Sequence, residues 1–258
     1  KLSLSIYDFQ TTNLISKGYS FDLVKMTADG RYIVITNEKQ KGLYSLSVYE
    51  RQTNKVIPLS TDNLFYKPQG NIDNLPFVYG YSPMQMTSDE RYIVFINQEQ
   101  EDLQSLFVYD IQANKTISVS SNKHFYEVHN SAERYLIFAT KEETQHSLFI
   151  YDFQTEKTYL VSKSDYLFRS IQMDENERYL LFKTGKETRE KIDYSDSISQ
   201  YPIWLYDHNT QETRFIAIGD EFALSGNGRY LVFTSAVDNL VPDDTNKAAD
   251  TFVIDLME

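Results

Sequence analysis

The dipeptide Arg-Tyr recurs five times in this chain, and the residues around it restrict the fold more than any other feature. Each copy opens a short run of aliphatic, β-branched and aromatic residues, as in Tyr92-Ile93-Val94-Phe95. The five copies begin at Arg31, Arg91, Arg134, Arg178 and Arg229. Short, continuous apolar runs are typical of β-strands that are covered on both faces. The repeat therefore predicts five equivalent buried strands.

A hydrogen-bonding side chain stands four residues before each of these arginines, which is typical of a tight turn. The five residues are Thr27, Thr87, Asn130, Asp174 and Ser225. Directly before the arginine, the first and last copies have Gly30 and Gly228, which supply a positive φ without strain. The middle copies have Glu90, Glu133 and Glu177 there. We expect those turns either to strain the glutamate or to relax to another type, at a cost of about 1 kcal/mol.

A second strand pattern follows each Arg-Tyr run and ends in an acid, usually after an aromatic residue, as in Leu106-Phe107-Val108-Tyr109-Asp110. A polar turn and a last short strand close the repeat, as at residues 115–120. The acids are Asp8, Glu50, Asp110, Asp152, Asp207 and Asp255. They recur every 42 to 60 residues, and no segment has a convincing helical period. Four-stranded propeller blades have about this length, so the sequence predicts an all-β fold, a β-propeller of antiparallel blades.

The repeat resembles the WD-repeat-like units of the TolB-like β-propeller family. The residues that carry the resemblance are Thr27-Ala28-Asp29-Gly30-Arg31-Tyr32 and Ser225-Gly226-Asn227-Gly228-Arg229-Tyr230. Residues 236–246 are similar to a version of the repeat that is common in bacteria. The resemblance covers essentially the whole chain and implies a propeller fold, but one fold hosts many activities. Because the same arginine, tyrosine and acid recur in every repeat, we interpret them as structural, in packing and turn capping.

The spacing predicts a single domain over residues 1–258 that belongs to a longer chain. Its units are residues 1–17, 18–60, 78–120, 124–162, 166–218 and 220–258, of which the first and last are partial. Six blades are favoured, with part of the ring outside this chain. In the alternative, residues 13–17 complete the last unit and close a ring of five blades.

The composition excludes several classes of partner. Acidic residues outnumber basic ones by 37 to 25, giving a formal net charge of −12, whereas phosphate contacts need a surplus of Lys and Arg. We therefore expect no nucleic acid and no anionic membrane surface as partner, and the apolar runs are too short to insert into a bilayer. Zero cysteine excludes disulfides and thiolate metal sites, and favours a bacterial extracytoplasmic compartment, with the cytoplasm as the alternative.

Two insertions interrupt the repeat, and long loops on a rigid scaffold are where binding usually occurs. Residues 62–83 supply the predicted binding residues, which are Phe65, Tyr66, Phe77, Tyr79 and Tyr81. Alternatively, these aromatic residues form a flap over one face of the ring. Residues 183–202 are rich in charge and form either a second binding loop or a solvated loop.

A calcium site is the one cofactor that the sequence suggests. Asp244, Asn246 and Asp250 offer oxygen ligands at a spacing that suits a hard cation. The segment lacks the glycine and the distal glutamate of an EF-hand, and Asp and Asn are ordinary turn residues, so an ordinary turn is the alternative. Otherwise we expect no cofactor.

No catalytic constellation is visible, because the four histidines are scattered and neither a nucleophile elbow nor a phosphate-binding glycine loop is present. We therefore expect no enzymatic activity. The sequence favours a scaffold or recognition module for a protein or peptide, whose surface is basic, within a larger bacterial protein. The alternatives are an accessory or gating propeller of a serine-peptidase-type hydrolase, and a sensor of a small molecule or sugar.

Overall fold

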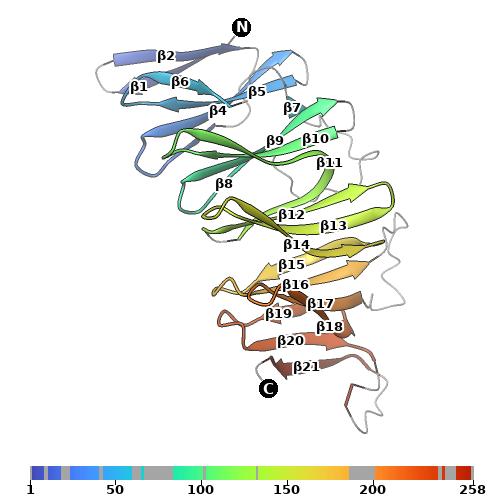
Figure 1. The fold of residues 1–258 in the computed structure, drawn as a ribbon. Coiled ribbons are helices and arrows are strands. Elements are labelled where there is room, and N and C mark those ends of the chain that lie inside the picture. The colour runs from blue at the N-terminus through green and yellow to red at the C-terminus, as the bar shows by residue number, and fades with distance from the viewer. Residues whose placement is uncertain are drawn as a thin grey trace. The chain divides into compact units, whose positions relative to one another are not determined.

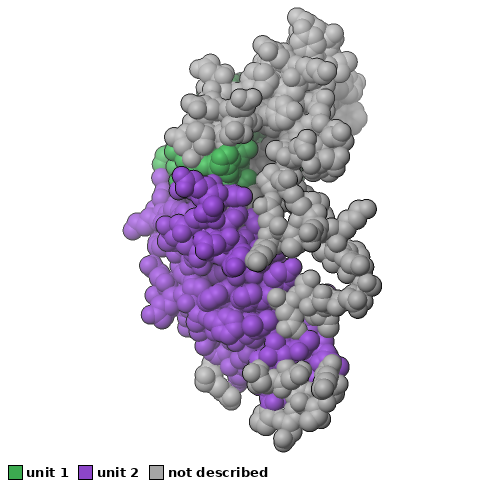
Figure 2. Space-filling model, turned by 90° about the vertical axis from the view of Figure 1, so that its right-hand side faces the viewer, with its two compact units in different colours: residues 1–126 green, residues 127–258 purple. Residues whose placement is uncertain are grey.

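The computed structural model describes most of the chain, and the described residues form β-strands joined by turns. They are residues 2–8, 11–18, 24–40, 43–59, 65–66, 84–100, 103–131, 133–185, 201–237, 240–241 and 248–256. The chain divides into two compact parts, an N-terminal half of residues 1–126 and a C-terminal half of residues 127–258 (Figure 2). In the part of the chain that is described, no helix has the length and apolar character that a membrane crossing requires.

The N-terminal half contains a hairpin and two repeats of antiparallel strands (Figure 1). Its strands are β1 Leu2–Asp8, β2 Thr11–Gly18, β3 Val24–Met26, β4 Tyr32–Gln40, β5 Leu43–Glu50, β6 Lys55–Pro58, β7 Phe65–Tyr66, β8 Met84–Met86, β9 Tyr92–Gln100 and β10 Leu103–Asp110. β1 pairs with β2, and the first repeat has the strand order β3-β4-β5-β6. The second repeat continues from β8 through β9 and β10 to β11, Lys115–Ser131.

The strand β11 is longer than the sequence predicts. We expected a strand at residues 115–120 that closes the second repeat, but β11 runs on to Ser131 and passes from one half of the chain to the other. Its first part pairs with β10, and β12 of the third repeat is its other neighbour in the sheet. The physical reason is that no Gly or Pro stands between Lys115 and Ser131 to end the strand.

The C-terminal half contains the rest of the third repeat, the fourth repeat and the fifth. Its strands are β12 Tyr135–Glu142, β13 Gln145–Asp152, β14 Lys157–Ser164, β15 Leu167–Met173, β16 Tyr179–Gly185, β17 Tyr201–Asp207, β18 Glu212–Gly219, β19 Phe222–Leu224, β20 Tyr230–Ser235 and β21 Asp250–Asp255. The fourth repeat is a four-stranded sheet in the order β15-β16-β17-β18, and the described strands of the fifth are β19-β20-β21. The predicted class, all-β with propeller-type blades of antiparallel strands, is confirmed. The number of blades stays a prediction.

The Arg-Tyr strands form the core of each half, as their apolar runs predict. All seven residues of β16 are buried, and so are the first six of β12, as expected for strands that are covered on both faces. In the N-terminal half, Val34 and Val48 of the first repeat cluster with Phe95 of the second. In the C-terminal half, Leu181 of the fourth repeat clusters with Phe233 of the fifth. Consecutive repeats within each half therefore pack face to face.

Because adjacent strands are antiparallel, each repeat has two different ends. The turn end of a repeat is the end at which the first strand connects to the second and the third strand connects to the fourth. The loop end is the opposite end, at which the second strand connects to the third and the fourth strand connects to the next repeat. The turns 51–54, 111–114, 153–156 and 208–211 lie at the turn end. The described strand ends that flank the two predicted insertions lie at the loop end: β8 begins after residues 67–83, and residues 186–200 come between the end of β16 and the start of β17.

Candidate functional site

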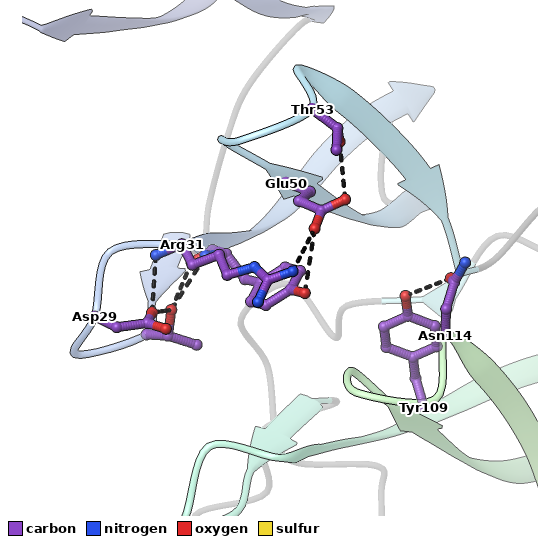
Figure 3. A network of polar contacts seen from close by, with 8 residues as sticks. Asp29, Arg31, Glu50, Thr53, Tyr109 and Asn114 are labelled. Atoms are coloured by element: carbon purple, nitrogen blue, oxygen red, sulfur yellow. Dashed lines mark hydrogen bonds and ion pairs between the residues drawn. The ribbon is translucent and has the colours of Figure 1, made fainter.

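The turn end is built from an ion pair that is the same in all five repeats. Each repeated arginine bridges to the acid at the end of the third strand, with N···O distances of 2.7–3.0 Å. Its guanidinium also lies 4.6–5.0 Å from the ring centroid of the tyrosine that follows it. The pairs are Arg31–Glu50, Arg91–Asp110, Arg134–Asp152, Arg178–Asp207 and Arg229–Asp255. Figure 3 shows the pair of the first repeat.

The acid of each pair also caps the turn that follows. Asp110 Oδ1 accepts hydrogen bonds from the N–H groups of Gln112 and Ala113, at 2.9 and 3.0 Å. Burial alone would raise the pKa of Asp110, but Arg91 and the turn amides outweigh it and hold that pKa below its usual range. In the first repeat, bonds from Thr53 and Arg31 lower the pKa of Glu50. The structural interpretation of the repeated arginine and acid is therefore supported by their geometry.

The turn between the first and second strands uses a hydroxyl in the way that its position predicts. Thr27 Oγ1 donates to Asp29 Oδ1 at 2.6 Å and accepts from the N–H of Tyr32 at 3.1 Å. Thr87 and Ser225 make the equivalent bonds in the second and fifth repeats. The arrangement holds the Arg-Tyr pair at the start of its strand in these three repeats, and in the fourth the Asp174 carboxylate takes the place of the hydroxyl by accepting from the N–H groups of Arg178 and Tyr179.

Two of the three glutamates at the glycine position take the strained conformation, and their carboxylates have a function that the sequence did not suggest. Glu90 and Glu177 have φ of 58° and 56°. The carboxylate of Glu90 accepts a 2.7 Å hydrogen bond from the N–H of Ala28, in the turn of the preceding repeat. The backbone of Arg134, in the repeat before, acts on the carboxyl of Glu177 as a hydrogen-bond donor that lowers its pKa, although burial outweighs it. These bonds connect turns of consecutive repeats and offset the strain.

The loop end, in contrast, contains a residue that differs from its equivalents in every other repeat. Lys183 is the fifth residue of its Arg-Tyr strand counted from the tyrosine, and its side chain is buried, with 7% of the residue exposed. The equivalent residues are Thr36, Ile96, Ala139 and Thr234. A buried lysine needs partners that replace its hydration. Lys183 is thus the strongest departure from the repeat among the described core residues.

The ammonium group of Lys183 is held from three sides. It donates a hydrogen bond to the backbone carbonyl of Asp220 and lies 3.5 Å from the Oδ1 atom of the same residue. The ring centroids of Tyr201 and Phe222 each lie 5.6 Å from Nζ. These contacts tie β16 to β17 and to the connection between the fourth and fifth repeats. The cluster therefore holds the ammonium group of Lys183 in place at the loop end.

Close packing fixes the two strand ends that residues 186–200 connect. A Cβ atom on Gly185 would lie 2.4 Å from the ring of Tyr201, so only glycine allows this ring to lie against the end of β16. One residue earlier, Thr184 Oγ1 accepts a 3.1 Å bond from the indole N–H of Trp204. Both ends of the charged insertion are therefore anchored on a rigid sheet.

Only part of the sequence-predicted sites lies in the described residues. Phe65 and Tyr66 form β7, which pairs with Tyr44 and Leu43 at the start of β5, at the loop end of the first repeat. The other predicted binding residues, Phe77, Tyr79 and Tyr81, lie outside the described residues.

The predicted calcium ligands are placed only in part. Asp250 begins β21, opposite Ser235, also at the loop end. Asp244 and Asn246 lie outside the described residues. Within the residues that are described, no three His, Asp or Glu side chains are grouped as a metal site would require. Calcium binding stays a prediction.

Lys183 was included in the second insertion by sequence reasoning, but its burial was missed. The signal that identifies it is the alignment of the five Arg-Tyr strands, in which lysine replaces Thr, Ile or Ala. Its partner Asp220 lies 37 residues away in sequence, and no local pattern connects the two.

No protein-family model matches the chain, and no curated protein matches its sequence. Among solved structures, the chain is similar to the tricorn protease, with a TM-score of 0.47 and 14% identity over 96% of this chain and 28% of that one. It is similar to TolB from Acinetobacter baumannii, with a TM-score of 0.38 and 13% identity over 92% of this chain and 55% of that one. For the β-propeller domain of the Trilobed protease from Pyrococcus furiosus, the TM-score is 0.47 and the identity 12%, over 93% of this chain and 71% of that one. The chain thus spans less than two thirds of the first two proteins.

Proposed function

We propose that this chain is a non-catalytic β-propeller module of a larger protein, and that it binds a protein or peptide through the loop end of its repeats. One observation carries the proposal. The turn end repeats the same ion pair in all five repeats, whereas the loop end has the strand ends that flank both insertions and Lys183, the one lysine that is buried among the described residues. A site that recognises one partner needs residues that are not repeated around the scaffold.

The residues available at the loop end suit a protein or peptide partner. The insertion at residues 62–83 supplies aromatic side chains, of which Phe65 and Tyr66 are tied to β5 through β7. Aromatic residues on a rigid support are the common anchors of protein interfaces. The net charge of −12 favours a partner with a basic surface, and an association rate that falls as salt is added.

The proposal is tested by comparing partner capture by the intact chain and by variants of each end. In one variant, a short Gly-Ser linker replaces residues 67–80, and in a second it replaces residues 186–199. The matched control is Gln154→Ser, which changes an exposed side chain at the turn end. We expect at least one loop variant to lose most of the captured partner while the control retains it, with all melting temperatures close to that of the intact chain.

Capture that is equal for the intact chain and both loop variants would contradict the proposal. So would loss of capture in the control alone, because it would place the binding surface at the turn end. Binding measured from low to high salt adds a second criterion, since an acidic surface that attracts a basic partner loses association rate as salt rises.

A further inference from the structure

At the turn end of the fourth repeat, a histidine occupies a position that the other repeats give mostly to apolar residues. His208 directly follows the acid Asp207 that ends β17. The equivalent residues are Arg51, Ile111, Phe153 and Leu256, and the three apolar ones are buried, with 9% or less exposed. The imidazole of His208 therefore stands where the repeat normally packs a hydrocarbon side chain between two sheets.

The ring of His208 is packed against tyrosines of two repeats. Its centroid lies 4.9 Å from that of Tyr135 and 5.2 Å from that of Tyr159, both in the third repeat. The ring of Tyr206, from the same strand as Asp207, lies 6.1 Å away. The backbone N–H of His208 donates to the carbonyl of Arg178 at 2.8 Å, and this bond fixes the backbone position from which the imidazole extends. The imidazole thus belongs to the interface between the third and fourth repeats.

The surroundings offer little to a protonated ring. Nδ1 of His208 is buried and has no hydrogen-bond partner among the described residues, and the same holds for the hydroxyl of Tyr206. An imidazolium carries a second N–H group that needs an acceptor, and leaving it unsatisfied in a buried site costs free energy. The interface is therefore built around the neutral imidazole.

The charged groups around the ring are mostly engaged with one another. Arg134 and Asp152 form the ion pair of the third repeat, and Arg178 and Asp207 form that of the fourth. Burial lowers the pKa of His208, and the positive charge of Arg134 lowers it further, against the opposing effect of Asp152 and Asp207. Burial keeps Tyr135 and Tyr206 neutral by raising their pKa values. Glu177, which accepts a bond from the backbone of Arg134, has its own pKa raised, mainly by burial.

We propose that His208 is an acid-sensitive joint between the third and fourth repeats. When the imidazole is protonated, the turn after β17 loses its packing against Tyr135 and Tyr159, and the two sheets separate more easily at this end. The joint lies at the end opposite to the proposed binding surface and does not depend on it. It goes beyond partner binding, because it makes the cohesion of the scaffold itself depend on pH.

The direction of the pH effect follows from proton linkage. The unfolded chain has an ordinary histidine, with a pKa of 6.5, and the folded state holds the same group at a lower pKa. The unfolded state therefore binds more protons below pH 6.5, and the stabilisation that is complete above this pH is lost as the pH falls below it. Asp110, Asp152 and Asp207 have lowered pKa values, so they add acid sensitivity only below their ordinary value of 3.8. Glu177 acts in the opposite direction, since a raised carboxyl pKa favours the folded state as the pH falls towards 4.5.

The joint is tested by thermal unfolding of the full chain between pH 7.5 and pH 5.0, which lies above the ordinary pKa values of the carboxylates. Glu177, whose pKa is raised, is present in the wild type and in both variants, so its effect cancels in the comparison. The variant is His208→Phe, because phenylalanine is the residue that the third repeat uses at this position. The matched control is His124→Gln, which removes an exposed histidine. We expect the melting temperature of the wild type to fall by roughly 2–4 °C more than that of His208→Phe over this range, and His124→Gln to follow the wild type.

Parallel curves for the wild type and His208→Phe would overturn the proposal. A steeper fall for His208→Phe would overturn it as well, because it would mean that the tyrosine rings stabilise the imidazolium through cation–π contacts. If His208→Phe does not fold, the wild-type protein decides the matter through the NMR titration of the His208 ring. An apparent pKa below 6.5 supports the joint, and a value at or above 6.5 rules it out.

Discussion

The two ends of each repeat are made by different means. At the turn end, five repeats use the same arginine, tyrosine and acid, and carboxylates such as that of Glu90 bond one turn to the next. At the loop end, three connections between second and third strands are two residues long, whereas those of the fourth and fifth repeats span residues 186–200 and 236–249. The anchor of the fourth repeat, Lys183, has no counterpart in the others. The repeated end therefore holds the sheets together, which leaves the other end free to vary with function.

The largest effect is expected when the repeated network is broken at its most buried acid. The side chain of Asp152 is only 2% exposed, pairs with Arg134 and caps the N–H groups of Gln154 and Thr155. Asp152→Ala removes all of these bonds at once, and we expect the free energy of unfolding to fall by about 2–3 kcal/mol in urea denaturation.

The matched control is Asp165→Ala, at the loop end of the same half, where the acid is exposed. We expect its free energy of unfolding to stay within about 0.5 kcal/mol of the wild type. Equal losses in the two variants would remove the distinction between the ends, because they would show that the turn-end acid stabilises no more than a surface charge.

How far the sequence predicts the two ends follows from how local their interactions are. The turn at Thr27 and Asp29 closes on Arg31 and Tyr32 within five residues, so composition and spacing are enough to predict it. The hydrogen bond that the N–H of Ala28 donates to the Glu90 carboxylate spans 62 residues, and the one that Lys183 donates to the Asp220 carbonyl spans 37. Such contacts depend on how repeats stack, which the sequence pattern implies only in outline. The fold class was therefore predictable, whereas the anchor at the loop end was not.

A smaller loss is expected from filling the space between β16 and β17. In Gly185→Ala, the new Cβ meets the ring of Tyr201, which must move, and overpacking of this kind costs about 2 kcal/mol. In a Tyr201→Ser background the clash is absent, so Gly185→Ala should lower the melting temperature less there than it does in the wild type. If the single variant melts like the wild type, the ring of Tyr201 is not fixed and the loop end is less rigid than its packing indicates.

The next effect separates stability from recognition. Lys183→Met keeps an unbranched chain between Tyr201 and Phe222 but loses the bonds to Asp220, and we expect a loss of about 1–2 kcal/mol in the free energy of unfolding. Under the proposed function, affinity for the partner should fall although the variant is fully folded at the assay temperature. The comparison variant is Gln98→Met, which introduces the same methionine side chain in β9, the second strand of the second repeat. Unchanged affinity in Lys183→Met would restrict Lys183 to a structural role.

The smallest effect compares two glutamates that have the same backbone strain at opposite ends. Glu90 at the turn end and Glu143 at the loop end have φ of 58° and 50°, but only Glu90 has a carboxylate bond recorded to a neighbouring turn within the described residues. Asparagine tolerates this conformation better than glutamate, yet its side chain is too short to reach Ala28. Glu90→Asn should therefore lower the free energy of unfolding by about 0.5–1 kcal/mol, whereas Glu143→Asn should leave it unchanged or raise it slightly. If both variants gain stability, the carboxylate bond does not offset the strain.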